Sequence, residues 1–164
     1  MFKHSLHLAA LATAVFFASG AMAQEAATMP AQSAAMDASA PRDPALKPVF
    51  DEFGGKPGLV AIMNDFMDNL VADPRTHPYF ANADRDHIKA ELVDQFCVIL
   101  DGPCTYTGKD MAKAHQNLGI NYAAFNALVE DLQKAMDKHH VPFRAQNKLL
   151  AKLAPMNKAI ITRK

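Results

Sequence analysis

The chain has 164 residues, half of them hydrophobic, with 17 basic and 17 acidic side chains and therefore no net formal charge. A nucleic acid or an anionic membrane surface would usually require a basic patch, so this balance argues against both as partners.

The first 23 residues are predicted to be a signal peptide. Lys3 gives a short basic start, residues 8–18 form an apolar run, and Ala21-Met22-Ala23 is the small-x-small pattern that precedes cleavage. A transmembrane anchor needs about 20 apolar residues, which this run does not supply. We expect cleavage after Ala23 and a periplasmic or secreted protein without a membrane anchor. Removal of Lys3 would leave 16 basic against 17 acidic side chains, a charge of −1.

Residues 24–45 are predicted to form a flexible linker. They are rich in Ala, Pro, Ser and Met and show no apolar periodicity. The remaining residues, 46–164, fit one compact domain within the usual range of about 50–200 residues. We expect this domain to be a monomer.

Apolar residues in the domain recur at helical spacing, which predicts an all-α fold. A short first helix should end at Gly54-Gly55, where positive φ is easily accommodated. A second helix should present an apolar face from Leu59 to Leu70 and stop at Asp73-Pro74. A tight corner with two aromatic residues, 75–80, follows it.

The second half of the domain should contain three further helices besides a short one near His115. One, at about 84–100, carries an inner face. Asn121 is expected to cap a long helix, Pro142 to lie in the first turn of the last helix, and Pro155 to kink that helix. The predicted inner face of the 84–100 helix consists of Ile88, Leu92, Phe96 and Ile99.

Residues 106–120 place one histidine in an apolar stripe. Met111, His115 and Leu118 share a helical face, so the His115 side chain is expected to point inward. An imidazole against an apolar slot is what an axial haem ligand requires. An inward histidine can equally be a hydrogen-bonded core residue, and spacing alone does not separate the two.

The same segment resembles the helix that carries the proximal histidine in group 1 truncated haemoglobins, the short two-over-two globins, particularly exported proteobacterial members. The resemblance covers about residues 46–162 and implies a two-over-two fold around haem b. Its matching motifs are Phe53-Gly54-Gly55, Asp65-Phe66, Ala72-Asp73-Pro74, Tyr79-Phe80, Gly102-Pro103-Cys104 with Tyr106 and Gly108, Met111 with His115, Gly119-Ile120, Phe125 and Val141-Pro142.

The resemblance implies a role for each matching position. His115 would be the proximal ligand of haem iron, and Phe80 would be wedged against the porphyrin. Met67, Ile88 and Leu92 would face the iron from the opposite, distal side. Other residues expected around the ring are Phe66, Phe96, Met111, Leu118 and Phe125, and candidates for contact with the propionates are Tyr106, His87, Lys89 and Lys113.

The distal side departs from the family's best-known pattern. Members often have tyrosine where Met67 stands and glutamine where Ile88 and Leu92 stand. Gln95 is the nearest polar candidate, although it could instead face solvent or bond to the backbone. A hydrogen bond to a charged group contributes about 1.5–3 kcal/mol, so without a distal donor we expect weak oxygen binding and ready autoxidation. Alternatively, Met67 or His87 could be a sixth iron ligand.

Cys97 and Cys104 are the only cysteines. In an oxidising compartment this pair predicts a disulfide. The alternative is a buried Cys97 with a free Cys104. A zinc site is disfavoured because no four-ligand cluster is nearby.

The function expected first is reversible binding of dioxygen or another diatomic gas at five-coordinate iron, without enzymatic activity. Detoxification of nitric oxide or peroxide is a second candidate, and it would need an external reductase because the chain has no flavin or nicotinamide motif. A third candidate is electron transfer through six-coordinate haem, and a fourth is a helical module that binds no haem.

Overall fold

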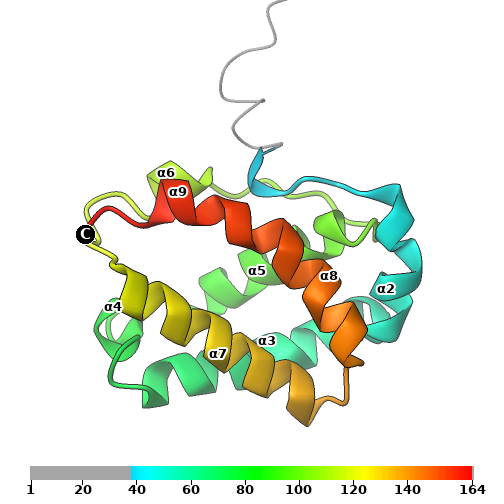
Figure 1. Ribbon diagram of the computed structural model, residues 1–164, viewed down its shortest axis with the longest axis horizontal. Coiled ribbons are helices and arrows are strands. Elements are labelled where there is room, and N and C mark those ends of the chain that lie inside the picture. Colours follow the sequence, from blue (N-terminus) through cyan, green and yellow to red (C-terminus); the bar gives the residue numbers. More distant parts are fainter. Residues whose placement is uncertain (1–37, 164) are drawn as a thin grey trace, which may run out of the picture.

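The computed structural model describes residues 38–163, and within them all regular structure is helical (Figure 1). The predicted signal peptide and residues 24–37 of the predicted linker lie outside the described residues. No helix between residues 38 and 163 combines the length and hydropathy needed to cross a bilayer. The elements are η1 (Pro44–Leu46), α2 (Lys47–Glu52), α3 (Gly55–Ala72), α4 (His77–Phe80), α5 (Arg85–Ile99), α6 (Met111–Ala114), α7 (Tyr122–Lys138), α8 (Phe143–Leu153), η2 (Ala154–Met156) and α9 (Asn157–Ile160).

The long helices form two layers. Helix α3 packs on both α5 and α7, and α8 contacts α2, α5 and α7. In Figure 1, α7 and α8 cross in front of α3 and α5. The prediction of an all-α, two-over-two fold is confirmed. The largest fully buried apolar side chains of the core are Phe66, Leu59, Ile62, Met63, Leu70, Ile99, Leu100, Leu132, Met136, Leu149 and Val49.

The glycine pair turns the chain between α2 and α3 as predicted. Gly54 has φ 76° and Gly55 has φ 63°, a backbone region that glycine occupies without steric cost. A side chain at Gly58, one turn into α3, would run into the carbonyl of Phe53. These glycines therefore let α2 and α3 meet at a close corner.

Side-chain caps set the beginnings of three helices that matter for the site. Asn121 accepts a hydrogen bond from the Ala124 amide at 2.9 Å, which confirms the predicted cap of α7. Asp84 caps α5 by accepting from the His87 amide at 3.1 Å. Asp110 caps α6 through the Lys113 amide at 2.9 Å. The expected corner at 75–80 contains α4, a single helical turn.

The C-terminal part of the fold is divided at proline, as proline's missing donor requires. Pro155 lies within η2, which separates α8 from α9. Pro142 is the N-cap of α8, one position before the predicted first turn. After α9 the chain returns to the loop that precedes α7, where Thr162 N and Arg163 N both donate to Ile120 O at 3.0 Å.

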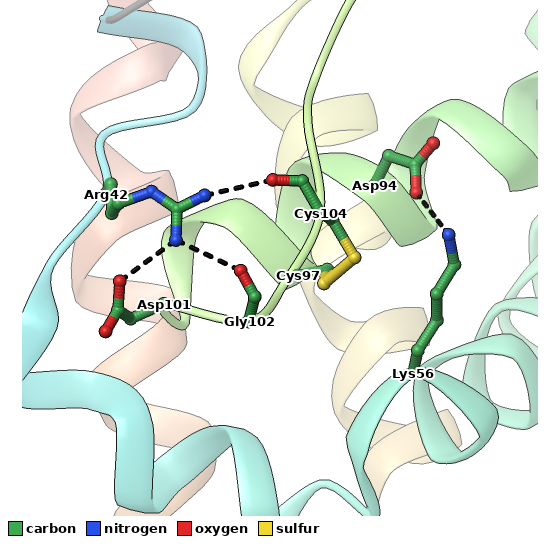
Figure 2. The surroundings of a disulfide bond; sticks show 7 residues. All are labelled: Arg42, Lys56, Asp94, Cys97, Asp101, Gly102 and Cys104. Atoms are coloured by element: carbon green, nitrogen blue, oxygen red, sulfur yellow. Dashed lines mark hydrogen bonds and ion pairs between the residues drawn. A yellow bond between two sulfur atoms is a disulfide. The ribbon is translucent and has the colours of Figure 1, made fainter.

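Residues 38–43, which fell within the predicted linker, pack against the domain. Ser39 and Ala40 are buried. The Arg42 guanidinium donates to Asp101 Oδ1 at 2.9 Å, and it also donates to two main-chain carbonyls, Gly102 O and Cys104 O, each at 3.0 Å (Figure 2). This segment is therefore part of the folded unit.

The sulfur atoms of Cys97 and Cys104 are joined in the structure, with a Cα–Cα distance of 5.8 Å (Figure 2). Cys97 is fully buried near the end of α5, and Cys104 lies in the segment that leads to α6. Gly102 lies inside the loop, where a Cβ would come within 2.6 Å of Cys97 Sγ and of the Phe50 ring. The pair thus ties the chain after α5 back onto that helix.

Candidate functional site: a cavity behind a single histidine

A cavity of about 410 Å³ is lined by residues of α3, α4, α5, α6, α7, α8 and α9. Its volume is within the range of about 300–1,000 Å³ that small-molecule and cofactor sites occupy. The apolar side chains that line it are Phe66, Leu70, Phe80, Ile88, Leu92, Phe96, Met111, Leu118, Ile120, Phe125, Leu128, Val129, Leu132, Leu150, Leu153, Met156 and Ile160.

His115 lines this cavity from the end of a very short helix. Helix α6 ends at Ala114, and His115 is its C-cap with φ −108°. The prediction of a helical stripe that continues to Leu118 is wrong, because positive φ at Asn117 and Gly119 turns the chain out of the helix. Leu118 nevertheless lines the cavity, with 45% of its surface exposed.

The ring of His115 is held in one tautomer. Nδ1 lies 2.8 Å from Met111 O, and because a carbonyl only accepts, Nδ1 carries the proton and donates it. Burial lowers the pKa of the imidazole, while the bond to Met111 opposes that shift in part. The ring is therefore favoured as a neutral imidazole with an unprotonated Nε2, which is the form that ligates a metal.

The wall contributed by α5 is apolar at its centre. Ile88 and Leu92 are four residues apart on one face of α5, and both line the cavity, as does Phe66 of α3. The structure thus brings together nearly all residues that the sequence predicted around the ring. It places His115, Phe80, Phe66, Phe96, Met111, Leu118, Tyr106 and Phe125 on the same cavity as Ile88 and Leu92.

Met67 does not lie on this cavity. It is buried, and it lines a separate surface hollow together with Asp68, Val71 and residues at the start of α5. The reason is helical geometry: Phe66 and Leu70 point to the cavity, and Met67 is about 100° further round α3 from Phe66. The expectation that Met67 faces the site is corrected accordingly.

Gln95 lines the cavity, but its amide is already engaged. The side chain is 4% exposed, and Nε2 donates to Ser39 O at 2.6 Å. The sequence left open whether this amide faces the bound gas, solvent or the backbone, and in the structure it bonds to the backbone. Because its partner lies 56 residues away in the chain, no local pattern could have indicated it.

Polar groups gather on other parts of the cavity wall. Tyr106 donates from its hydroxyl to Lys109 O at 2.7 Å, and burial, helped by the carboxylates of Glu91 and Asp110, raises its pKa to about 12. Lys109 and Glu91 line the cavity although the sequence did not single them out. The polar lining residues are Thr76, Tyr79, His87, Glu91, Gln95, Tyr106, Lys109 and His115.

Two lysines considered for propionate contact lie off the cavity. Lys89 pairs with Asp86 at 2.9 Å, and its ammonium also donates to Asn64. Lys113 is 3.5 Å from Asp110 and mostly exposed. Of the predicted propionate candidates, only His87 and Tyr106 line the cavity.

The donor set suits haem. An apolar slot offers one neutral imidazole nitrogen, and hydroxyl and ammonium groups on the wall could receive two carboxylates. Within residues 38–163 no group of three or more His, Cys, Asp and Glu side chains could hold a metal ion by itself. His115 would ligate the iron, Ile88 and Leu92 would face the opposite side of the ring, and the Lys109 ammonium would meet a propionate. The Tyr106 hydroxyl, which donates its proton to Lys109 O, would position that residue.

Paired helices around an apolar cavity, with one histidine ring held by a main-chain carbonyl, point to the globin class, and comparison with known proteins bears this out. The family described as bacterial-like globin matches residues 48–162. A group 1 truncated haemoglobin of Mycolicibacterium paratuberculosis is 28% identical over 114 residues, covering 70% of this chain and 84% of the relative. That of Tetrahymena thermophila is 33% identical over 84 residues, covering 51% and 69%.

A solved structure also supports the truncated globin fold. The Fe(III) form of the truncated haemoglobin from Tetrahymena pyriformis superposes with a TM-score of 0.66 at 26% identity, covering 69% of this chain and 97% of that one. The chain belongs to the bacterial-like globin family, as a group 1 truncated globin. Membership makes it a haem protein that binds a diatomic gas.

Proposed function

We propose that the protein binds dioxygen or another diatomic gas reversibly at haem b, with His115 as the proximal ligand of a five-coordinate iron. When bound, the haem supplies the iron at which the gas is held. The observation that carries the proposal is the His115 ring, fixed by Met111 O at 2.8 Å so that Nε2 is free in an apolar cavity. A bridge between Cys97 and Cys104 would leave no thiol for covalent attachment, which supports haem b.

The distal wall supports weak retention of oxygen. Ile88 and Leu92 have no hydrogen-bond donor in their side chains, and the Gln95 amide donates to Ser39 O. A donor aimed at a ligand that gains negative charge would contribute about 1.5–3 kcal/mol. His87 also lines the cavity, and we propose that its side chain serves a propionate rather than the bound gas, so we expect fast oxygen release and ready autoxidation.

Export to the periplasm, through a signal peptide cut after Ala23, belongs to the same proposal. A disulfide between Cys97 and Cys104 would persist in that compartment. We also propose that the protein is a monomer, since the large apolar side chains exposed within residues 38–163 are few: Val60, Leu118, Tyr122 and Phe143.

The test is an absorption spectrum of the haem-loaded ferrous protein. We expect a five-coordinate spectrum that disappears in His115→Gly and returns when imidazole is added. The matched control is His87→Gly, which removes the other histidine on the cavity wall and should leave the spectrum unchanged. A His115→Gly protein that kept the wild-type spectrum without imidazole would show the proximal assignment to be wrong. Sharply split visible bands in the wild type, lost in His87→Gly, would replace the proposal with a six-coordinate electron carrier.

Detoxification of peroxide is a second candidate, favoured by one observation. His87 and Glu91 are four residues apart on α5, both line the cavity, and both can hold a proton, as peroxide chemistry requires. An external reductase would then be needed. Peroxide consumption that depends on added reductant and is lost in His87→Gly would favour this candidate, and equal consumption by both proteins would count against it.

A further inference from the structure

An N-terminal segment outside the globin match contacts two residues that line the haem cavity. Residues 38–43, which we call the strap, precede the part of the chain that matches the family, 48–162. Within the strap, Ser39 is 2% and Ala40 is 7% exposed, so these residues are as buried as the core. The strap therefore has partners that the family resemblance does not account for.

Ser39 bonds to two neighbouring residues of the cavity lining, Gln95 and Met111, whose side chains also meet at 3.8 Å between Nε2 and Sδ. Its backbone carbonyl accepts the hydrogen bond from Gln95 Nε2 at 2.6 Å, on the α5 side. Its hydroxyl oxygen accepts from Met111 N at 3.0 Å, on the α6 side. Gln95 and Met111 both line the cavity. One residue of the strap thus adds two hydrogen bonds to the contact between α5 and α6.

Met111 connects Ser39 to the imidazole of His115, because its amide bonds to Ser39 and its carbonyl to the ring. Met111 O accepts from His115 N at 3.2 Å and lies 2.8 Å from His115 Nδ1. Helix α6 is four residues long, too short to hold its shape without external partners. Ser39 supplies such a partner to the first amide of this helix, an amide that a helix cannot satisfy internally.

The strap is itself anchored at its other end. Arg42 donates to Asp101, Gly102 O and Cys104 O, on the loop closed by the cysteine pair (Figure 2). Asp43 pairs with Lys152 at 2.7 Å. These contacts lie three and four residues from Ser39, so the position of Ser39 is set by the strap as a whole.

We propose that Ser39 is a positioning residue for the haem site: by holding Met111 it fixes the orientation of the His115 ring and the retention of haem. This inference rests on the proposed role of His115 as iron ligand. It assigns the function of a site residue to a position that lies outside the globin match.

The test is Ser39→Ala in the full chain, which removes the hydroxyl and leaves the carbonyl that binds Gln95. Three measurements are made: the iron–histidine stretching frequency of the ferrous protein, the rate of haem transfer to excess apomyoglobin, and hydrogen exchange of the Met111 amide in the haem-free protein. We expect a shifted stretching frequency, haem loss faster by about fivefold, as one hydrogen bond implies, and loss of protection at Met111. Ser39→Thr, which restores a hydroxyl, should return all three toward wild type.

The control is Gln146→Leu, which removes two side-chain hydrogen bonds, a part-buried one to Asp137 and a buried one to Val141 O, near the turn between α7 and α8. None of these residues lines the cavity, so it should lower stability without moving the stretching frequency. An unchanged frequency and haem-loss rate in Ser39→Ala would overturn the proposal. The same changes in Gln146→Leu would also overturn it, because they would reflect general stability.

Two further outcomes are separable. If Ser39→Ala does not fold, Arg42→Ala loosens the strap while keeping the serine hydroxyl, and it should accelerate haem loss in the same direction; wild-type haem loss there would overturn the proposal. If the wild type takes up no haem, the proposed function fails. Hydrogen exchange of the Met111 amide in the haem-free protein then still tests the contact between Ser39 and Met111. If Ser39→Ala leaves the protection of this amide unchanged, the contact does not exist.

Discussion

Removal of the bridge between Cys97 and Cys104 should destabilise the protein by a predictable amount. The bridge closes a short loop, since the two residues are separated by 7 positions. The chain-entropy relation for a loop of about eight residues gives about 2.5 kcal/mol at 25 °C. For a domain of this size that corresponds to a fall in Tm of about 8–12 °C. The variant to use is Cys104→Ala, because it breaks the bridge and keeps the fully buried sulfur of Cys97 in place.

The assay is urea unfolding of the oxidised wild type, the same protein reduced with dithiothreitol, and Cys104→Ala. The reduced wild type and the variant should agree with each other and lie below the oxidised protein. Oxidised and reduced wild type within about 0.5 kcal/mol of each other would refute the reasoning, because loop closure alone requires more. Alkylation followed by mass measurement of protein taken from the periplasm gives an independent check: two modified thiols would show that the bridge does not form there.

Three further outcomes are expected. Ile88→Gln places an amide donor on the apolar wall and should slow oxygen dissociation by at least about tenfold, as followed by ligand displacement in stopped flow; an unchanged rate would count against the apolar-wall explanation. Met67→Leu should leave the ferrous spectrum unchanged, because Met67 lies off the cavity, whereas loss of a six-coordinate spectrum would contradict its placement. The pKa of Tyr106 is raised from 10.0 to about 12, so the unfolded chain releases this proton first and stability should fall as pH rises from 10 toward 12; Tyr106→Phe should remove that part of the alkaline loss in denaturation curves, and identical curves would show that Tyr106 does not cause it.

The parts of the fold that could be predicted are those that depend only on residues close together in the sequence. The glycine pair needs only its own backbone freedom, and the Asn121 cap bonds an amide three residues away. The inward face of α5 follows from helical spacing, which placed Ile88 and Leu92 on the cavity wall.

The errors have two physical origins: local geometry that periodicity or the family pattern did not capture, and contacts between residues distant in sequence. Periodicity extended the His115 helix to Leu118, but α6 ends at Ala114, and the chain then turns at Asn117, where φ is 63°. The family pattern predicts that Met67 faces the cavity. In the structure Phe66 faces it, and Met67, the next residue of α3, points about 100° away. The sequence pattern assigns Ser39 to the flexible linker because its hydrogen-bond partners, Gln95 and Met111, lie 56 and 72 residues further along the chain.

The ties between the two ends of the domain and residues 111–120 have a consequence for the order of folding. Ser39 holds Met111 at one end of this stretch, and Thr162 N and Arg163 N donate to Ile120 O at its other end. Contacts of such long sequence separation form late, because the loops they close must be ordered first. We therefore expect the histidine segment to be held at both ends only once the chain through Arg163 is present, and stable uptake of haem to follow that step.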